Sequence, residues 1–265
     1  MIKIKYIFLY SCLLTCCLYS VETMADKHLS TIDAENKLGE KISKNIQIMT
    51  DEDELLSLGN IFNQGTPVIL VMAYYQCPML CSLVLNGLSE ALSESNLSPG
   101  DDYKILTVSI NPKESSSLSK EKKTSYISKY FKSSSSSDFW IFSTATQDNI
   151  DQLTNELGFI YSYDEKIDQF AHPAIVYVLT EDGVVSKQIF GINPTPNDIK
   201  LSLLSARDNN VSSIFDKILL YCYKYDPKAG NYTMIASNVM KIAGASTVFI
   251  MGGFLSFFWI RERIV

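Results

Sequence analysis

The chain has 265 residues and a formal net charge of −6. Hydrophobic residues make up 46% and charged residues 20% of the sequence, so a sizeable core can form and global disorder is excluded. No basic stripe interrupts this acidity, which argues against nucleic acid as a partner.

The first 25 residues have the pattern of an export signal. Two lysines precede a mostly apolar run over residues 6–18, and small residues lead up to Ala25. We expect cleavage near Ala25. The alternatives are an uncleaved signal anchor and a lipoprotein signal at Cys16 or Cys17. Residues 26–38 follow as a polar lead-in.

The other end of the chain predicts a transmembrane helix. Residues 242–260 contain no charged side chain, and that length suffices for a bilayer core of about 30 Å at about 1.5 Å per residue. Trp259 lies at its edge, and two arginines follow within residues 261–265. The positive-inside rule then predicts a cytoplasmic tail, a juxtamembrane segment over 209–241 and a functional domain outside the cell (inner) membrane, in the periplasm or extracytoplasmic space. A buried core helix is the alternative.

The cysteines divide into two sets. Three of the six lie in the export signal, where they serve as apolar filler, and Cys77, Cys81 and Cys222 remain. That number is too small for a disulfide scaffold. A close thiol pair in an oxidising compartment therefore indicates reactivity or metal binding. Cys222 is an accessory ligand, a partner for mixed disulfides or a buried apolar residue.

Residues 39–208 alternate as an α/β domain does. The apolar run over 67–75 predicts a strand buried on both faces, and a helical pattern over 83–92 follows, with Pro78 expected in its first turn. The acidic stretch up to residue 60 is not expected to contribute to the core.

The remaining elements complete a thioredoxin-like order. In chain order we expect a strand at 103–110, a helix at 120–131, a low-complexity loop at 133–137, a strand at 139–142, a helix at 148–157 ended by Gly158, a hairpin of 174–179 and 184–190 turning at 181–183, and a helix at about 197–206. The order β-α-β-α-β-α-β-β-α predicts a central mixed sheet flanked by helices, with one unit inserted.

Two thiols lie at the start of the first helix of this domain. Residues Cys77 and Cys81 are expected to face the same side, and the partial positive charge of the helix N-terminus favours thiolate. Cβ atoms four residues apart in a regular helix are about 5–6 Å apart, whereas a disulfide needs about 3.5–4.5 Å. We therefore predict a redox-active dithiol whose bridge needs a loosened first turn and is easily reduced. Two buried packing cysteines are the alternative.

A histidine is expected to join the thiols. His172 is one of two histidines, and the other, His28, lies in the lead-in. His172 precedes a predicted central strand, where Pro173 favours an extended backbone, and in a thioredoxin-like sheet that loop faces the cysteine helix. Two thiolates and one imidazole suit Cu(I), and Cu(II) with an added ligand, whereas structural zinc needs four ligands. A hydrogen-bonded loop histidine is the alternative.

Several stretches together resemble the Sco/SenC family of copper-binding thioredoxin-like proteins. They are Tyr74–Cys81, Val84–Leu88, Val108–Pro112 and the segment 169–183. The resemblance spans roughly residues 39–206 and is to a longer bacterial branch with a Tyr-Asp-Pro segment and a C-terminal membrane helix.

The resemblance implies a copper chaperone or thiol reductant in assembly of the binuclear copper site of cytochrome c oxidase. It implies Cys77, Cys81 and His172 as copper ligands, with the oxidase copper-site subunit and other copper carriers as partners. Asn111 and Lys224 depart from the family, which has an acidic residue and a histidine there. A thiol-disulfide oxidoreductase without copper delivery and a copper or redox sensor are the alternative functions.

Overall fold

The computed structural model of the chain describes residues 33–208 except for 63 and 133–135, then 223–226, 231–234 and a few positions between 244 and 251. The predicted export signal, most of the predicted membrane span, His28 and Cys222 lie outside these residues. Within the described part of the chain, no helix combines the length and apolar character that a membrane crossing needs.

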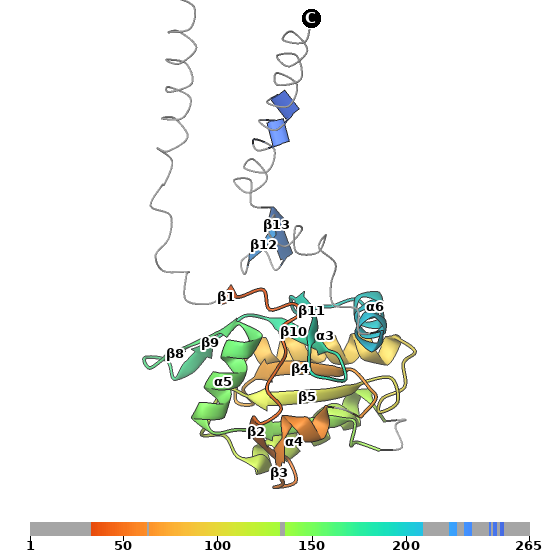
Figure 1. Ribbon diagram of the computed structural model, residues 1–265. Helices are drawn as coiled ribbons and strands as arrows, with labels where there is room; N and C mark the ends of the chain where they lie inside the picture. Colours follow the sequence, from red (N-terminus) through yellow and green to blue (C-terminus); the bar gives the residue numbers. More distant parts are fainter. Residues whose placement is uncertain are drawn as a thin grey trace, which may run out of the picture.

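A seven-stranded mixed sheet forms the centre of the domain (Figure 1). Its strands are β2 (Gln47–Thr50), β3 (Leu55–Ser57), β4 (Val68–Ala73), β5 (Lys104–Ser109), β6 (Trp140–Thr144), β10 (Ile175–Leu179) and β11 (Val185–Phe190). The order across the sheet is β11-β10-β4-β5-β6-β2-β3. The strands β4, β5 and β6 run parallel, and the outer strands pair antiparallel with their neighbours.

Helices flank this sheet. They are α2 (Leu58–Ile61), α3 (Leu80–Glu94), α4 (Ser116–Tyr130), α5 (Gln147–Leu157) and α6 (Pro196–Arg207). Helix α3 contacts both α4 and α6. Three small antiparallel pairs complete the described structure: β1 (Asp33–Ala34) with β7 (Phe159–Ile160), β8 (Ser162–Asp164) with β9 (Gln169–Ala171), and β12 (Tyr223–Asp226) with β13 (Asn231–Met234). Figure 1 shows the β8–β9 pair projecting from the edge of the domain.

The predicted α/β order is confirmed. Every residue of β4 is buried, as expected for a strand with a partner on each side and helices over the sheet. Gly158 ends α5 in the left-handed region at φ 66°, as predicted for its cap. The mixed sheet with its flanking helices is the thioredoxin-like fold.

The prediction for the stretch up to residue 60 was wrong. Strands β2 and β3 extend the sheet beyond β6, and the side chains of Ile46, Ile48 and Leu58 are at most 1% exposed. Apolar residues in this stretch stand singly or in pairs between polar ones, and strands of three or four residues are too short to show a period. The burial of these side chains depends on the pairing of β2 with β6, which is distant in sequence.

Gly87 marks the closest approach between α3 and the chain after β11. A Cβ atom at this position would lie 1.9 Å from the carbonyl oxygen of Ile192. Because that neighbour is backbone rather than a flexible side chain, any larger residue forces the 192–193 segment to move.

We expect Gly87→Ala to lower the free energy of unfolding by about 1–3 kcal/mol, although alanine favours a helix over glycine. Urea unfolding followed by tryptophan fluorescence measures this change. Ser93→Ala, at an exposed position of the same helix, is the matched control and should change stability by less than about 0.5 kcal/mol. A Gly87→Ala chain as stable as the unmodified one would contradict the close packing.

Candidate metal centre

Strand pairing brings the predicted site residues to one edge of the sheet. Because β10 runs antiparallel to β4, with Leu179 opposite Val68, the start of β10 lies beside the end of β4. Cys77 follows β4, and His172 precedes β10. Residues separated by 91 positions in sequence, Cys81 and His172, therefore meet.

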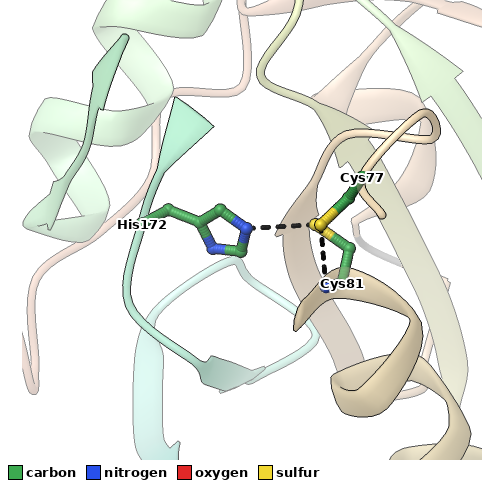
Figure 2. A group of neighbouring side chains, drawn as sticks. All are labelled: Cys77, Cys81 and His172. Atoms are coloured by element: carbon green, nitrogen blue, oxygen red, sulfur yellow. Dashed lines mark hydrogen bonds between the residues drawn. The ribbon is translucent and has the colours of Figure 1, made fainter. Parts of the chain in front are cut away.

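The three side chains converge on one point. The sulfurs of Cys77 and Cys81 and a ring nitrogen of His172 all lie within 4.8 Å of one another, and no other such group occurs among the described residues. The Nε2 atom of His172 is 3.0 Å from the Sγ atom of Cys81, and Figure 2 shows the imidazole ring pointing at the sulfurs. Both thiols are free. The predicted juxtaposition is therefore present.

The protein holds the His172 ring from its other side. Its Nδ1 atom lies 3.0 Å from the carbonyl oxygen of Pro173, which can only accept a hydrogen bond. With the hydrogen on Nδ1, the Nε2 lone pair faces the sulfurs, which is how proteins orient a metal-binding imidazole. The ring is 6% exposed and stacks on Phe159, with Tyr74 edge-on to it.

The helix begins later than predicted. Helix α3 starts at Leu80, after Met79, whose φ of −147° and ψ of −65° are not helical. The prediction that Pro78 lies in the first turn was therefore wrong, and Cys77 precedes the helix. The Cβ–Cβ distance of about 5–6 Å between residues four apart in a regular helix therefore does not apply to Cys77 and Cys81.

The Cys77 sulfur replaces a missing helix cap. Met79 provides no side-chain cap. Instead the backbone N–H of Cys81, in the first turn, donates to the Cys77 sulfur over 3.3 Å. An otherwise unsatisfied helix donor therefore stabilises negative charge on that sulfur.

The two thiols differ in acidity and in access to solvent. A hydrogen bond from the Cys81 thiol lowers the pKa of Cys77 to about 3 against the opposing effect of burial, and backbone N–H groups add to the lowering. Burial raises the pKa of Cys81 well above its usual range, and the Cys77 charge adds to this. Cys81 is 4% exposed, whereas Cys77 is half-buried. The pair is thus an accessible thiolate beside a buried thiol.

Two residues near the thiols were not identified from sequence. Tyr74 donates its backbone N–H to the Cys81 sulfur over 3.4 Å, and burial followed by a hydrogen bond to Cys77 raises the pKa of its hydroxyl. Glu114 is buried and accepts the backbone N–H groups of Tyr75 and Gln76. Glu114 places a carboxylate three residues after Asn111, the position at which the resemblance to the Sco/SenC family predicts an acidic residue. Glu114 was missed because an acidic residue in a polar stretch is ordinarily exposed.

The sequence model of the SCO1/SenC family matches residues 36–203 of this chain. The chain belongs to that family. A search of curated proteins finds no match.

Solved structures share the fold with this SCO1/SenC protein. A protein of Aquifex aeolicus VF5 described as an electron transfer protein is 22% identical, with a TM-score of 0.57, over 64% of this chain and 95% of its own. Arabidopsis thaliana ScoI with copper bound is 16% identical, with a TM-score of 0.51, over 65% and 99%. BsSco, in which a disulfide switch was identified and which belongs to the Sco family of cytochrome c oxidase assembly proteins, is 19% identical, with a TM-score of 0.50, over 66% and 97%.

The donor set of this chain fits copper. Thiolate sulfurs are soft ligands that select Cu(I), and imidazole also binds copper, whereas structural zinc is four-coordinate. The Cys-Cys-His group can therefore hold the metal that is bound in the ScoI structure.

We expect iodoacetamide to alkylate Cys77 at nearly the same rate at pH 5 and pH 8 in the reduced, copper-free chain. A thiol with a pKa of about 3 is already thiolate throughout this range, so the rate is lost only as the pH falls toward that value. Peptide mass spectrometry reports each cysteine separately, and a Cys77→Ser chain shows whether the buried Cys81 reacts. A Cys77 rate that falls about tenfold per pH unit below pH 8, as for an ordinary thiol, would contradict this electrostatic account.

Proposed function

We propose that this protein binds one copper ion through Cys77, Cys81 and His172 and passes it to the binuclear copper site of cytochrome c oxidase. The observation that carries this proposal is the 3.0 Å approach of His172 Nε2 to Cys81 Sγ within a group of three soft donors. A histidine with a purely structural role has no need to face a thiol pair.

The burial pattern favours transfer over storage. Cys81 and His172 are at most 6% exposed, whereas Cys77 is half-buried. A partner thiolate can reach the metal from the Cys77 side while the other two ligands still hold it. Exchange by successive ligand replacement then needs no unfolding of the domain.

The choice of acceptor rests on the family. BsSco belongs to a family of cytochrome c oxidase assembly proteins, and ScoI holds copper in its structure. We therefore propose the copper-site subunit of the oxidase as the acceptor, with other copper carriers as further partners.

A second function, as a thiol-disulfide oxidoreductase, is favoured by the pairing of an accessible Cys77 with a buried Cys81. In this reaction the Cys77 thiolate attacks a disulfide of the acceptor, forms a mixed disulfide and releases one acceptor thiolate. Cys81 then displaces the second acceptor sulfur and closes the Cys77–Cys81 disulfide. Two electrons and the Cys81 proton pass to the acceptor, solvent supplies the second proton, and the acceptor cysteines become ready to bind copper.

We propose that the domain acts at a membrane surface outside the cytoplasm. The proposal rests on the export signal pattern and on the uncharged stretch 242–260 with its following arginines. Anchoring would raise the effective concentration of the domain near an integral membrane partner.

We expect the unmodified, reduced chain to bind about one Cu(I) and His172→Ala to bind it at least about tenfold more weakly, because one ligand of three is lost. Competition with a Cu(I) chelator measures both affinities. His28→Ala, which removes the only other histidine, is the control and should not change them. Full copper affinity in His172→Ala would remove the histidine from the site.

The two functions separate in a second assay. We expect the reduced chain to reduce an oxidised two-cysteine peptide from an oxidase copper site, and this reaction to be lost in Cys77→Ser but retained in His172→Ala. Thiol release from the peptide measures the rate. A Cys77→Ser chain with an unchanged rate would eliminate the oxidoreductase function without affecting the copper proposal.

Membrane topology has a direct test. We expect alkaline phosphatase fused after residue 208 to be active and the same enzyme fused after residue 265 to be inactive, because only the first lies outside the cytoplasm. A fluorescent protein at the same two positions should give the reverse pattern. Active phosphatase at the C-terminus would contradict the proposed orientation.

A further inference from the structure

A buried carboxylate lies directly behind the cysteine loop. Glu114 follows β5 and precedes α4, and its side chain is buried at the same sheet edge as the thiols. Its Oε2 atom accepts the backbone N–H of Tyr75 over 2.8 Å, and its Oε1 atom accepts that of Gln76 over 2.8 Å. The hydroxyl of Ser109 donates to Oε2 over 2.6 Å.

These contacts complete the hydrogen bonding of the loop between β4 and Cys77. The backbone N–H of Tyr74 donates to the Cys81 sulfur, and that of Cys77 donates to the Tyr74 carbonyl oxygen. The N–H groups of Tyr75 and Gln76 both donate to Glu114. Every backbone donor from residue 74 to residue 77 thus has one defined partner, and a single side chain supplies half of those partners.

The same turn is also fixed through a side chain. The Tyr75 hydroxyl donates to the Ser143 carbonyl oxygen over 2.7 Å and accepts from the Ser143 N–H over 2.9 Å, which joins the turn to β6. Glu114 therefore holds the backbone of a residue whose ring is already anchored in the core. Residues 77–79, between this turn and α3, belong to no helix or strand.

We infer that Glu114 is a positioning residue that fixes the 74–76 turn and thereby sets the place of Cys77 relative to Cys81 and His172. With the turn held, a change between the dithiol, metal-bound and disulfide states is confined to the short segment from Cys77 to Met79. Glu114 is not one of the three proposed ligands. The effect of Glu114 on copper binding rests on the proposed function, whereas its effect on the Cys77–Cys81 dithiol does not.

The charge of the group suits this role. A carboxylate offers only acceptors, and the loop presents two backbone N–H groups to it. Hydrogen bonds from backbone N–H groups to an ionised carboxylate are stronger than those to a neutral amide. Glutamine at this position would keep the shape, but it would turn an NH₂ group toward one of the N–H donors and leave that donor without a partner.

The test compares Glu114→Gln and Ser109→Ala with Glu90→Gln, an exposed substitution of the same kind on α3, all in the full chain purified in a mild detergent. We expect Glu114→Gln to weaken Cu(I) binding at least about tenfold, as loss of a group that orients a metal ligand does. In the copper-free chain we expect the Cys77–Cys81 equilibrium with glutathione to shift by about fivefold or more, as loss of a loop hydrogen bond predicts. The spectrum of the Cu(II)-loaded chain should also change, and Glu90→Gln should change none of these quantities.

Thermal unfolding shows whether each variant is folded. If Glu114→Gln does not fold, Ser109→Ala decides, because it removes one partner of the carboxylate and leaves the loop backbone intact. It should shift the glutathione equilibrium in the same direction by a smaller factor. A folded Glu114→Gln chain whose copper affinity, glutathione equilibrium and Cu(II) spectrum all match the unmodified chain would overturn the inference. If the unmodified chain binds no copper, the proposed function fails, and the glutathione equilibrium still tests Glu114.

Discussion

The pairing of β4 with a parallel β5 on one side and an antiparallel β10 on the other is the constraint on which the site depends. The ends of β4 and β5 and the start of β10 meet at one edge of the sheet. At that edge lie the cysteine loop, the turn with Glu114 and the loop with His172. A slip of one residue between β4 and β10 would turn the β10 side chains to the opposite face and displace His172 from the thiols.

The site has a fixed part and an accessible part. His172 is held by the Pro173 carbonyl oxygen and two aromatic neighbours, and Cys81 is buried in the first turn of α3. Cys77 lies on irregular backbone between the turn held by Glu114 and the start of α3. In the proposed copper centre the two buried side chains would define where the metal binds, and Cys77 would be the side from which a partner reaches it. The proposed metal capture and disulfide chemistry would use the same accessible sulfur and would therefore be alternative states of one centre.

Features that depend on neighbouring residues were predictable from sequence. The unbroken apolar run of β4, the Gly158 cap and the turn through Gly183, at φ 81°, each carry a local signal. The meeting of His172 with the thiols was also predictable, because a thioredoxin-like strand order places the two loops at one edge.

The start of α3, the burial of Glu114 and the strands β2 and β3 were not predictable. The start of α3 is set by Met79 and by the Cys77 sulfur acting on the helix end, which the pattern of apolar residues does not encode. Glu114 meets Tyr75 across 39 residues, so nothing near it in sequence marks it as buried. Strands β2 and β3 likewise become recognisable only when β2 pairs with β6 and β3 pairs with β2.

X-ray absorption spectroscopy of the Cu(I)-loaded full chain tests the central claim most directly, since it identifies the atoms bound to the metal. Ligation by Cys77, Cys81 and His172 predicts a copper shell of two sulfur atoms and one imidazole nitrogen, with the outer-ring scattering that an imidazole produces. A shell of sulfur alone, or of light atoms without sulfur, would contradict it.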